Sequence, residues 1–330
     1  MLRSDNMEIK NINLNKLRDR SVGFIWAFYR SVTLFSISMI LLFPVLYMIS
    51  MAFRPALEVS DPMVIWLPKT FTLLNITEAL SVMDYLNATL TTFRFTLLSS
   101  FLTICSCSIA GYGFARFKFR FRKQLFMIVL LSLIVPPQNI LISTFLQFRN
   151  FDLFGLGSLI GLFTGKPMTV NLIGSELSLY LPAFFASGIR SGLYILIFNK
   201  FYSNLPKELE EAAYIDGCSV YSTFLRVMLP NASSALLTVF LFSIVWYWND
   251  YFFVSVYMQN STTLSIQLTR LKALLNEALN PLGTGTFVNP SEITVRLLAG
   301  CLLVILPLIV LYIFLQKYFT DSIERTGIVG

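Results

Sequence analysis

Long apolar runs alternate with polar segments along the whole chain. Six of these runs exceed 18 residues, which is close to the length that an α-helix needs to cross the roughly 30 Å hydrocarbon core of a bilayer. The pattern therefore predicts an all-α membrane protein with six transmembrane helices. The six predicted helices are residues 32–53, 88–115, 124–144, 179–200, 232–258 and 295–315.

Prolines lie inside the first and the third of the predicted helices. Pro44 lies inside the first, and Pro136 and Pro137 stand side by side in the third. A proline lacks the backbone N–H that a helix needs, so two in succession should force a bend. The bend in the third run leaves two interpretations open. It is either a static kink or a broken helix that lines a pathway, where freed carbonyl groups can face water.

The composition agrees with a protein embedded in a membrane. Hydrophobic residues make up 55% of the 330 positions and charged residues only 13%, whereas about a quarter of the residues of a soluble domain are charged. The first apolar run is also longer than the roughly 7–15 residues of a signal peptide's apolar core. We therefore expect the first run to be an uncleaved helix.

The distribution of the net charge of +7 predicts a topology. Lysines and arginines gather in the N-terminal segment, in residues 116–123, between the fourth and fifth predicted helices, and after the sixth. Because basic loops stay in the cytoplasm, both termini are expected there. The chain then divides into a cytoplasmic N-terminal segment (residues 1–31), a six-helix domain (residues 32–316) and a cytoplasmic tail (residues 317–330).

Residues 116–123 alternate basic side chains with phenylalanines. Such alternation can bind single-stranded nucleic acid, but here the segment joins two predicted transmembrane helices. We interpret it as a short cytoplasmic turn whose rings rest at the lipid interface. We expect no nucleic-acid partner.

The sequence offers little for catalysis or metal binding. Histidine is absent, which removes the commonest metal ligand and general base. The stretch from Gly161 to Lys166 resembles a nucleotide-binding loop, but it has one spacer residue too few, and Pro167 stands where a Ser or Thr should hold magnesium. We predict no catalytic residue, no metal and no bound cofactor. The four cysteines are interpreted as small packing residues, with Cys218 as the candidate for an exposed thiol.

The segment between the fourth and fifth predicted helices, residues 201–231, has the signals of ordered structure. Pro206 suits the first turn of a helix, and Gly217 can adopt the left-handed conformation that ends one. A second helix over residues 220–229 should stop at Pro230. A membrane protein has little reason to keep such a segment unless a partner docks there. A helix lying on the lipid surface is the alternative, but the three glutamates of the first helix would be repelled by an anionic leaflet.

This segment carries a specific resemblance. A Glu-Ala-Ala triplet, a glycine and a Leu-Pro pair are spaced as in the cytoplasmic signature of the transmembrane subunits of bacterial ABC importers, with Val227 where that signature usually has Ile. The resemblance implies that the signature helix contacts a separate ATPase. The implied ATPase-coupling residues are Glu211, Ala212, Ala213, Asp216, Gly217, Leu229 and Pro230.

Features outside this motif narrow the resemblance. The Trp248-Asn249-Asp250 sequence, and Pro307 in the sixth predicted helix, are similar to the carbohydrate-importing branch and to the maltose-type permease subunit. The resemblance covers all six predicted helices. Residues 155–176 depart from it, because this outer segment is longer than in compact members of the family.

The resemblance implies a pore-forming permease subunit of an ATP-driven importer that carries a carbohydrate, expected to be an oligosaccharide, into a bacterial cell. The implied partners are a second six-helix permease subunit in a heterodimer, two cytoplasmic ATPases that bind ATP and magnesium, and an extracytoplasmic solute-binding protein. Closure of the ATPases would move the docking helix and, through it, the fourth and fifth helices. The alternative is a permease for a non-sugar solute, such as a polyol or a phosphate ester. An intramembrane enzyme or a secondary transporter fits less well, because catalytic groups and internal repeats are missing.

Polar residues inside the predicted helices are candidates for the solute pathway. A charge in the middle of the fourth helix costs about 2.5–3.5 kcal/mol on insertion scales, so Arg190 should face the bundle interior, with Asp250 as its candidate partner. Arg94, near the outer end of the second helix, is expected to extend its charge to the interface. The aromatic cluster of the fifth helix could stack on sugar rings or anchor the helix at the membrane surface. The pathway candidates are Arg190, Tyr247, Trp248, Asn249 and Asp250.

Overall fold

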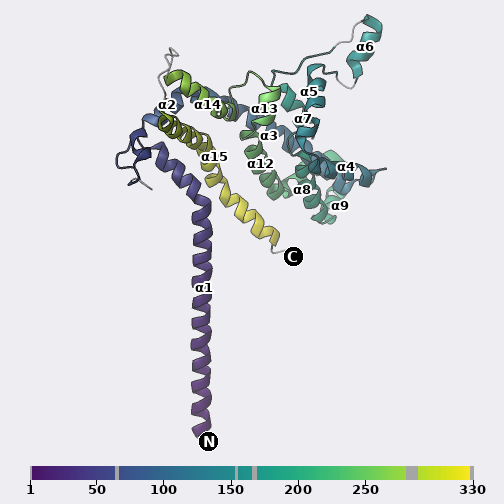
Figure 1. Cartoon of the computed structure of the whole chain (residues 1–330). Helices are drawn as coiled ribbons and strands as arrows, with labels where there is room; N and C mark the ends of the chain where they lie inside the picture. The colour runs from purple at the N-terminus through teal and green to yellow at the C-terminus, as the bar shows by residue number, and fades with distance from the viewer. Residues whose placement is uncertain (1, 64–66, 153–154, 166–168, 280–288, 328–330) are drawn as a thin grey trace. The chain divides into compact units, whose positions relative to one another are not determined.

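The computed structural model of this chain describes residues 2–63, 67–152, 155–165, 169–279 and 289–327 (Figure 1). Over these residues the regular structure is helical, and the β contact among them is an isolated bridge between Phe151 and Val170. The chain divides into two units, which we describe separately. The first holds Met1–Ile76 and Asn289–Leu302, and the second holds Thr77–Val288 and Leu303–Gly330.

The first unit contains the long N-terminal helix α1 (Leu2–Ala52), which passes through Pro44. Its stretch Gly23–Ala52 is apolar enough to cross a membrane, and most of its large apolar side chains are exposed. Such a surface indicates a contact with lipid or with protein. The other elements of this unit are η1 (Ala56–Ser60), the first part of α2 (Leu74–Val82) and the first part of α15 (Pro290–Gly327).

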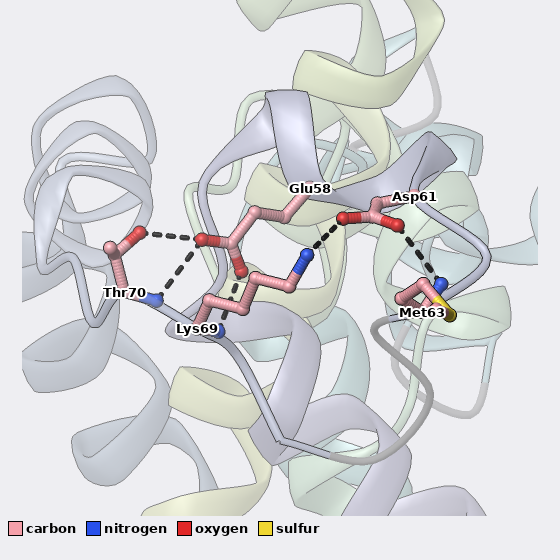
Figure 2. A network of polar contacts seen from close by, with 5 residues as sticks. All are labelled: Glu58, Asp61, Met63, Lys69 and Thr70. Atoms are coloured by element: carbon pink, nitrogen blue, oxygen red, sulfur yellow. Dashed lines mark hydrogen bonds and ion pairs between the residues drawn. The ribbon is translucent and has the colours of Figure 1, made fainter.

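Charged side chains close the loop that follows α1 (Figure 2). The Glu58 carboxylate accepts hydrogen bonds from the backbone N–H groups of Lys69 (2.9 Å) and Thr70 (3.0 Å) and from the Thr70 hydroxyl (2.6 Å). The Lys69 ammonium pairs with Asp61 at 2.5 Å, and Asp61 also accepts the N–H of Met63 at 2.9 Å. The Thr70 hydroxyl lowers the pKa of Glu58, and the Lys69 ammonium lowers the pKa of Asp61. The loop is therefore held by ionised carboxylates.

The second unit contains the remaining helices, and Figure 1 labels the longer of them. Before the docking segment they are α3 (Tyr85–Arg116), α4 (Arg122–Ile134), η2 (Pro137–Ile140), α5 (Leu141–Arg149), α6 (Leu156–Thr164), α7 (Leu177–Phe184) and α8 (Ser191–Asn204). From the docking segment onward they are α9 (Glu208–Ile215), α10 (Val220–Thr223), η4 (Phe224–Met228), α11 (Leu229–Asn231), α12 (Ser233–Trp248), α13 (Phe252–Tyr257), α14 (Leu264–Leu279) and the rest of α15.

Helix α3 is at the centre of the second unit and packs against α7, α8, α12 and α14. Small residues on its buried side let neighbouring backbones approach closely. At Gly111 an added Cβ would lie 2.4 Å from the Cβ of Phe198 and 3.0 Å from the backbone nitrogen of Asn199. The crossing of α3 and α8 therefore requires a glycine at this position.

Three described helices are long and apolar enough to cross a membrane alone: Gly23–Ala52, Tyr85–Arg116 and Pro290–Lys317. Two further pairs of helices are long and apolar enough only when each pair is taken as one span. These two pairs are bent by 99° and 77°. By length and composition the described residues thus contain three spans, or up to five. The expected count of six stays a prediction.

The third predicted helix bends at its proline pair, as expected. Helix α4 ends at Ile134, and the short η2 begins at Pro137. The following helix continues at an angle of 99°, because the two prolines cannot supply the backbone N–H groups that would continue the first. A role of this bend in a pathway stays a prediction.

The fourth predicted helix is broken, contrary to expectation. Helix α7 ends at Phe184, and α8 begins only at Ser191. Between them Gly188 lies so close to α12 that an added Cβ would be 2.8 Å from the Tyr247 hydroxyl. Ala186 has a positive φ of 54°, a conformation that a helix cannot contain. The break therefore depends on a contact with a distant part of the chain.

The fifth predicted helix is also broken. Helix α12 ends at Trp248, and α13 begins at Phe252. In the break the Asp250 carboxylate accepts a hydrogen bond from the N–H of Val254 at 3.0 Å. Asp250 stands one residue before Tyr251, the N-cap of α13, and its carboxylate accepts from the first turn of this new helix, as aspartates near helix starts do.

Candidate functional site

The docking segment folds into a short helix and a glycine corner, as the sequence predicts. Helix α9 has acidic residues in its first turn, and Gly217 follows it with a positive φ of 82°. The N–H of Gly217 donates to the Tyr214 carbonyl at 3.0 Å, and the N–H of Cys218 donates to the Ala213 carbonyl at 2.9 Å. These bonds satisfy the last carbonyls of the helix. No atom lies within 4 Å of a Cβ built at Gly217, so a larger residue would strain the backbone without a steric clash.

The second helix of the segment continues past the residue predicted to stop it. Helix α10 leads into η4, which is a π-helical turn, and then into α11, which contains Pro230. A wider turn directly before a proline gives its ring the room that a regular helix lacks. The chain bends by 77° only after Asn231. The predicted end at residue 229 is therefore two residues too early.

One side of this segment is exposed and apolar. Ile215 is 86% exposed and Tyr221 is 82% exposed, whereas Ala213 is buried. Large apolar side chains with so much open surface indicate a contact with another molecule. This side, called the docking surface below, consists of Glu211, Ala212, Tyr214, Ile215 and Tyr221.

The opposite side of α9 is fixed to the end of α3. Oε1 of Glu210 accepts a hydrogen bond from the Tyr112 hydroxyl at 2.7 Å, and Oε2 of Glu210 lies 3.5 Å from Nε of Arg116. Nη2 of Arg116 donates to the Leu205 carbonyl at 2.6 Å. The side chains of Arg116 and Glu210 are only 7% and 12% exposed. Loss of one partner would leave a charge without its counter-charge in a nearly dry site, which costs about 3–5 kcal/mol.

Reasoning from sequence missed this group, which we call the Arg116–Glu210 cluster (Tyr112, Arg116 and Glu210). The sequence marks Glu210 only as an acidic residue of the first helical turn, and Arg116 only as part of a basic turn. The available signal was an arginine at the end of an apolar run and a glutamate next to the docking motif. No spacing in the sequence links the two, because they meet only through tertiary packing.

Arg190 does not lie in the middle of a helix. It directly precedes α8, with a φ of 59°. Its guanidinium carbon lies 4.3 Å from the centroid of the Trp246 ring, a geometry typical of a cation–π contact. No ion pair joins Arg190 to Asp250 among the residues that the structure describes. The predicted pair is therefore replaced by the contact with Trp246.

Two pathway candidates are buried inside the second unit. The Tyr247 hydroxyl shares a hydrogen bond of 2.9 Å with the Thr103 hydroxyl, and Nε1 of Trp248 donates to the Val304 carbonyl at 3.1 Å. Asn249, in contrast, is exposed at the end of α12. In this conformation Tyr247 and Trp248 pack the interior. A solute contact by any of the pathway candidates stays a prediction.

Arg94 forms an ion pair, where the sequence predicted a charge extended to the interface. Its Nη2 pairs with Oε1 of Glu176, and the Tyr180 hydroxyl donates to the other carboxylate oxygen at 2.6 Å. The pair ties α3 to the start of α7. Glu176 ends the long outer segment 155–176, of which residues 166–168 lie outside the described residues.

The described residues include no group of three or more Cys, Asp or Glu side chains placed to hold a metal. Cys107 is buried, as expected of a small packing residue, while Cys105 is exposed. Cys218, the predicted exposed thiol, is only partly exposed. None of these groups adds a chemical site to the docking segment.

Comparisons with known proteins show the family to which this chain is similar. Residues 106–325 match the family described as binding-protein-dependent transport system inner membrane component. An arabinooligosaccharide transport system permease protein of Halalkalibacterium halodurans is 25% identical over 301 residues, which cover 89% of this chain and 93% of the relative. A polygalacturonan/rhamnogalacturonan transport system permease protein of Bacillus subtilis is 24% identical over 305 residues, covering 89% and 94%.

The fold is similar to a solved structure. That structure is a bacterial ABC transporter involved in the import of the acidic polysaccharide alginate, and the match covers 89% of this chain and 96% of the other, with a TM-score of 0.65 and 20% identity. The family match extends over more than half of the chain and includes the whole docking segment. The chain therefore belongs to the family of inner membrane components of binding-protein-dependent transport systems.

Proposed function

We propose that this chain is a pore-forming permease subunit of an ATP-driven importer, and that it translocates a carbohydrate, in particular an oligosaccharide, across the bacterial cytoplasmic membrane. The names of the relatives, which refer to arabinooligosaccharides and to polygalacturonan or rhamnogalacturonan, support a carbohydrate cargo. The long apolar helices support a multi-pass position in the membrane. A non-sugar solute, such as a polyol or a phosphate ester, is the second candidate.

The docking surface is the observation that carries the proposal. Ile215 and Tyr221 are largely open to solvent in the segment between α8 and α12. The glycine corner after α9 fixes this surface in one orientation. We propose that it contacts a cytoplasmic ATPase, and that Glu211 pairs with a basic residue there. ATP and magnesium then belong to two ATPase subunits and not to this chain.

The topology and the other partners follow from the same proposal. Both termini and the docking segment, residues 201–231, lie in the cytoplasm, in agreement with the basic residues near them. A second six-helix permease subunit completes the pore as a heterodimer, and an extracytoplasmic protein delivers the solute. The exposed apolar side of α1 supports a large contact with lipid or with that second subunit.

Co-purification tests the docking surface. We expect the double variant Gly217→Asp/Glu211→Lys to insert in the membrane but to lose the ATPase, because it strains the corner and reverses the charge beside it. Gly165→Asp is the matched control: Gly165 also has a positive φ, of 79°, and open space around it, but it lies on the outer segment. ATPase at the wild-type level with the double variant would show that this segment is not the coupling surface.

Two further measurements complete the test. The purified chain alone in nanodiscs should hydrolyse no ATP above background, and robust vanadate-sensitive turnover would contradict the proposal. Calorimetric titration of the co-purifying solute-binding protein with oligosaccharides, polyols and phosphate esters decides the cargo. Binding of oligosaccharides alone supports the carbohydrate proposal, whereas binding of the other solutes alone favours the second candidate.

A further inference from the structure

We propose that Arg116 and Glu210 are positioning residues that fix the docking helix to α3, so that α3 moves with the docking helix when the ATPases close. This inference rests on the proposed function, because it takes the ATPases to act on the docking surface. The sequence predicts a relay from the docking helix to the fourth and fifth helices alone. The structure adds a direct connection to the second predicted helix.

The first step concerns the direction of Glu210. Helix α9 has three glutamates in its first turn, and Glu208 and Glu211 are exposed. Glu210 points inward. One of its carboxylate oxygens accepts a hydrogen bond from the Tyr112 hydroxyl, and the other lies 3.5 Å from Nε of Arg116. Both oxygens thus engage α3. The charge of Glu210 is therefore not available to a partner at the docking surface.

The second step concerns Arg116, which contacts the chain on both sides of the turn before α9. Its Nη2 donates to the carbonyl of Leu205, directly after α8, while its Nε faces the Glu210 carboxylate. The guanidinium is nearly buried, and a charge-assisted bond gains strength where water is excluded. A displacement of α9 relative to α3 would have to break the contact of Arg116 with Glu210, and a displacement of the end of α8 would have to break its bond to Leu205.

The third step concerns the rings around Tyr112. The centroid of its ring lies 5.4 Å from that of Tyr202 on α8 and 5.0 Å from that of Phe224 on η4. These two residues come from the segments that precede and follow the docking helix. Directly before Tyr112 on α3, Gly111 lies so close to α8 that an added Cβ would be 2.4 Å from the Cβ of Phe198. Packed interiors respond to a push by moving as a whole, since they have few voids.

These contacts join α9, the end of α8, η4 and the last turns of α3 in one packed body. Helix α3 also runs through the centre of the second unit, where it contacts α7 and α12. A movement of the docking helix therefore reaches the interior of the second unit through α3. Arg116 and Glu210 form the one ion pair of this body among the described residues.

A distance measurement tests the inference in the assembled transporter, purified through a tag on this chain. Spin labels are placed at Ile109 on α3 and at Lys207 before α9, both exposed, in a background without the native cysteines. We expect the same narrow distance distribution without nucleotide and in the vanadate-trapped state. A shift of the mean distance between the two states, larger than the width of the nucleotide-free distribution, would overturn the inference.

Variants then test the role of the charge. Glu210→Gln should broaden the distance distribution in the trapped state while the ATPase still co-purifies, and Arg116→Lys, which keeps the charge, should broaden it less. Glu208→Gln is the matched control, because it makes the same change on an exposed glutamate of the same turn, and it should leave the distribution unchanged. An unaltered distribution with Glu210→Gln would show that the ion pair does not position the helix.

The two proposals fail in different ways. If no ATPase co-purifies with the wild-type chain, the proposed function is wrong. If the ATPase co-purifies and the distance between α3 and α9 changes on trapping, the proposed function stands and the positioning role of Arg116 and Glu210 is wrong. The wild-type measurement needs no destabilising substitution, so a variant that fails to fold does not remove the test.

Discussion

The guanidinium of Arg190 stacks over the ring of Trp246, with 4.3 Å between the guanidinium carbon and the ring centroid. This contact joins the break before α8 to the last turn of α12. It gives Arg190 a partner that carries no charge. An arginine in the middle of a continuous helix would have needed a carboxylate or several carbonyls instead.

The contribution of this stack can be measured with a double-mutant cycle. Trp246→Leu removes the aromatic face and should lower the free energy of unfolding by about 0.5–2 kcal/mol, and Trp246→Phe should lower it less. The cycle is completed with Arg190→Gln and with the double variant, and thermal unfolding of the purified protein in detergent provides the values. Strictly additive effects of Trp246→Leu and Arg190→Gln would mean that the two side chains do not interact.

The break between α7 and α8 predicts where residue 190 lies in the membrane. Non-helical backbone at membrane depth is tolerated where protein buries it or where it lines water, and not against lipid. In a background without other cysteines, Arg190→Cys should therefore resist a lipid-soluble spin probe. Ile37→Cys, on the exposed apolar side of α1, should react with that probe readily. Strong labelling at both positions would place Arg190 against lipid.

The crossing of α3 and α8 predicts opposite effects at two glycines of the same helix. Gly111→Ala places a Cβ 2.4 Å from the Cβ of Phe198, so we expect a loss of about 1–3 kcal/mol of stability from overpacking. At Gly113 no atom lies within 4 Å of the added Cβ, and Gly113→Ala should be neutral or stabilising because alanine favours the helix. Melting temperatures of the two purified variants distinguish them, and equal values would mean that the helices do not cross so closely.

The loop after α1 should respond to pH through Glu58. Its carboxylate holds the N–H groups of Lys69 and Thr70, and its pKa lies below the ordinary 4.5, chiefly because of the Thr70 hydroxyl. A lowered pKa means that the stabilisation is complete above the ordinary value and is lost as the pH falls through the lowered one. Hydrogen exchange at the amides of Lys69 and Thr70, corrected for the intrinsic rate, should accelerate only in that acidic range.

The same amides provide a test by substitution. Glu58→Gln should accelerate their exchange at neutral pH, because the charged acceptor is gone. Glu277→Gln, at an exposed glutamate of α14, is the control and should leave these amides unchanged. Protection that survives Glu58→Gln at neutral pH would show that the carboxylate does not hold the loop.

The sequence alone predicts the features that depend on neighbouring residues. The apolar runs indicate an all-helical membrane protein, the proline pair indicates the bend between α4 and η2, and Gly217 indicates the corner after α9. Each of these signals acts over a few residues, through hydropathy, a missing N–H or a permitted positive φ. The docking motif can be recognised in the sequence for the same reason, since its residues are close together in the chain.

Only the tertiary structure decides the features that depend on distant contacts. The fourth predicted helix breaks where Gly188 lies against Tyr247, and Arg190 then stacks on Trp246. Glu210 turns inward because α3 supplies Arg116 there. No local pattern records such contacts, because an apolar run looks the same whether a neighbouring helix interrupts it or not. The chain thus encodes its docking segment locally, while the way this segment is fixed to the membrane helices is determined by packing.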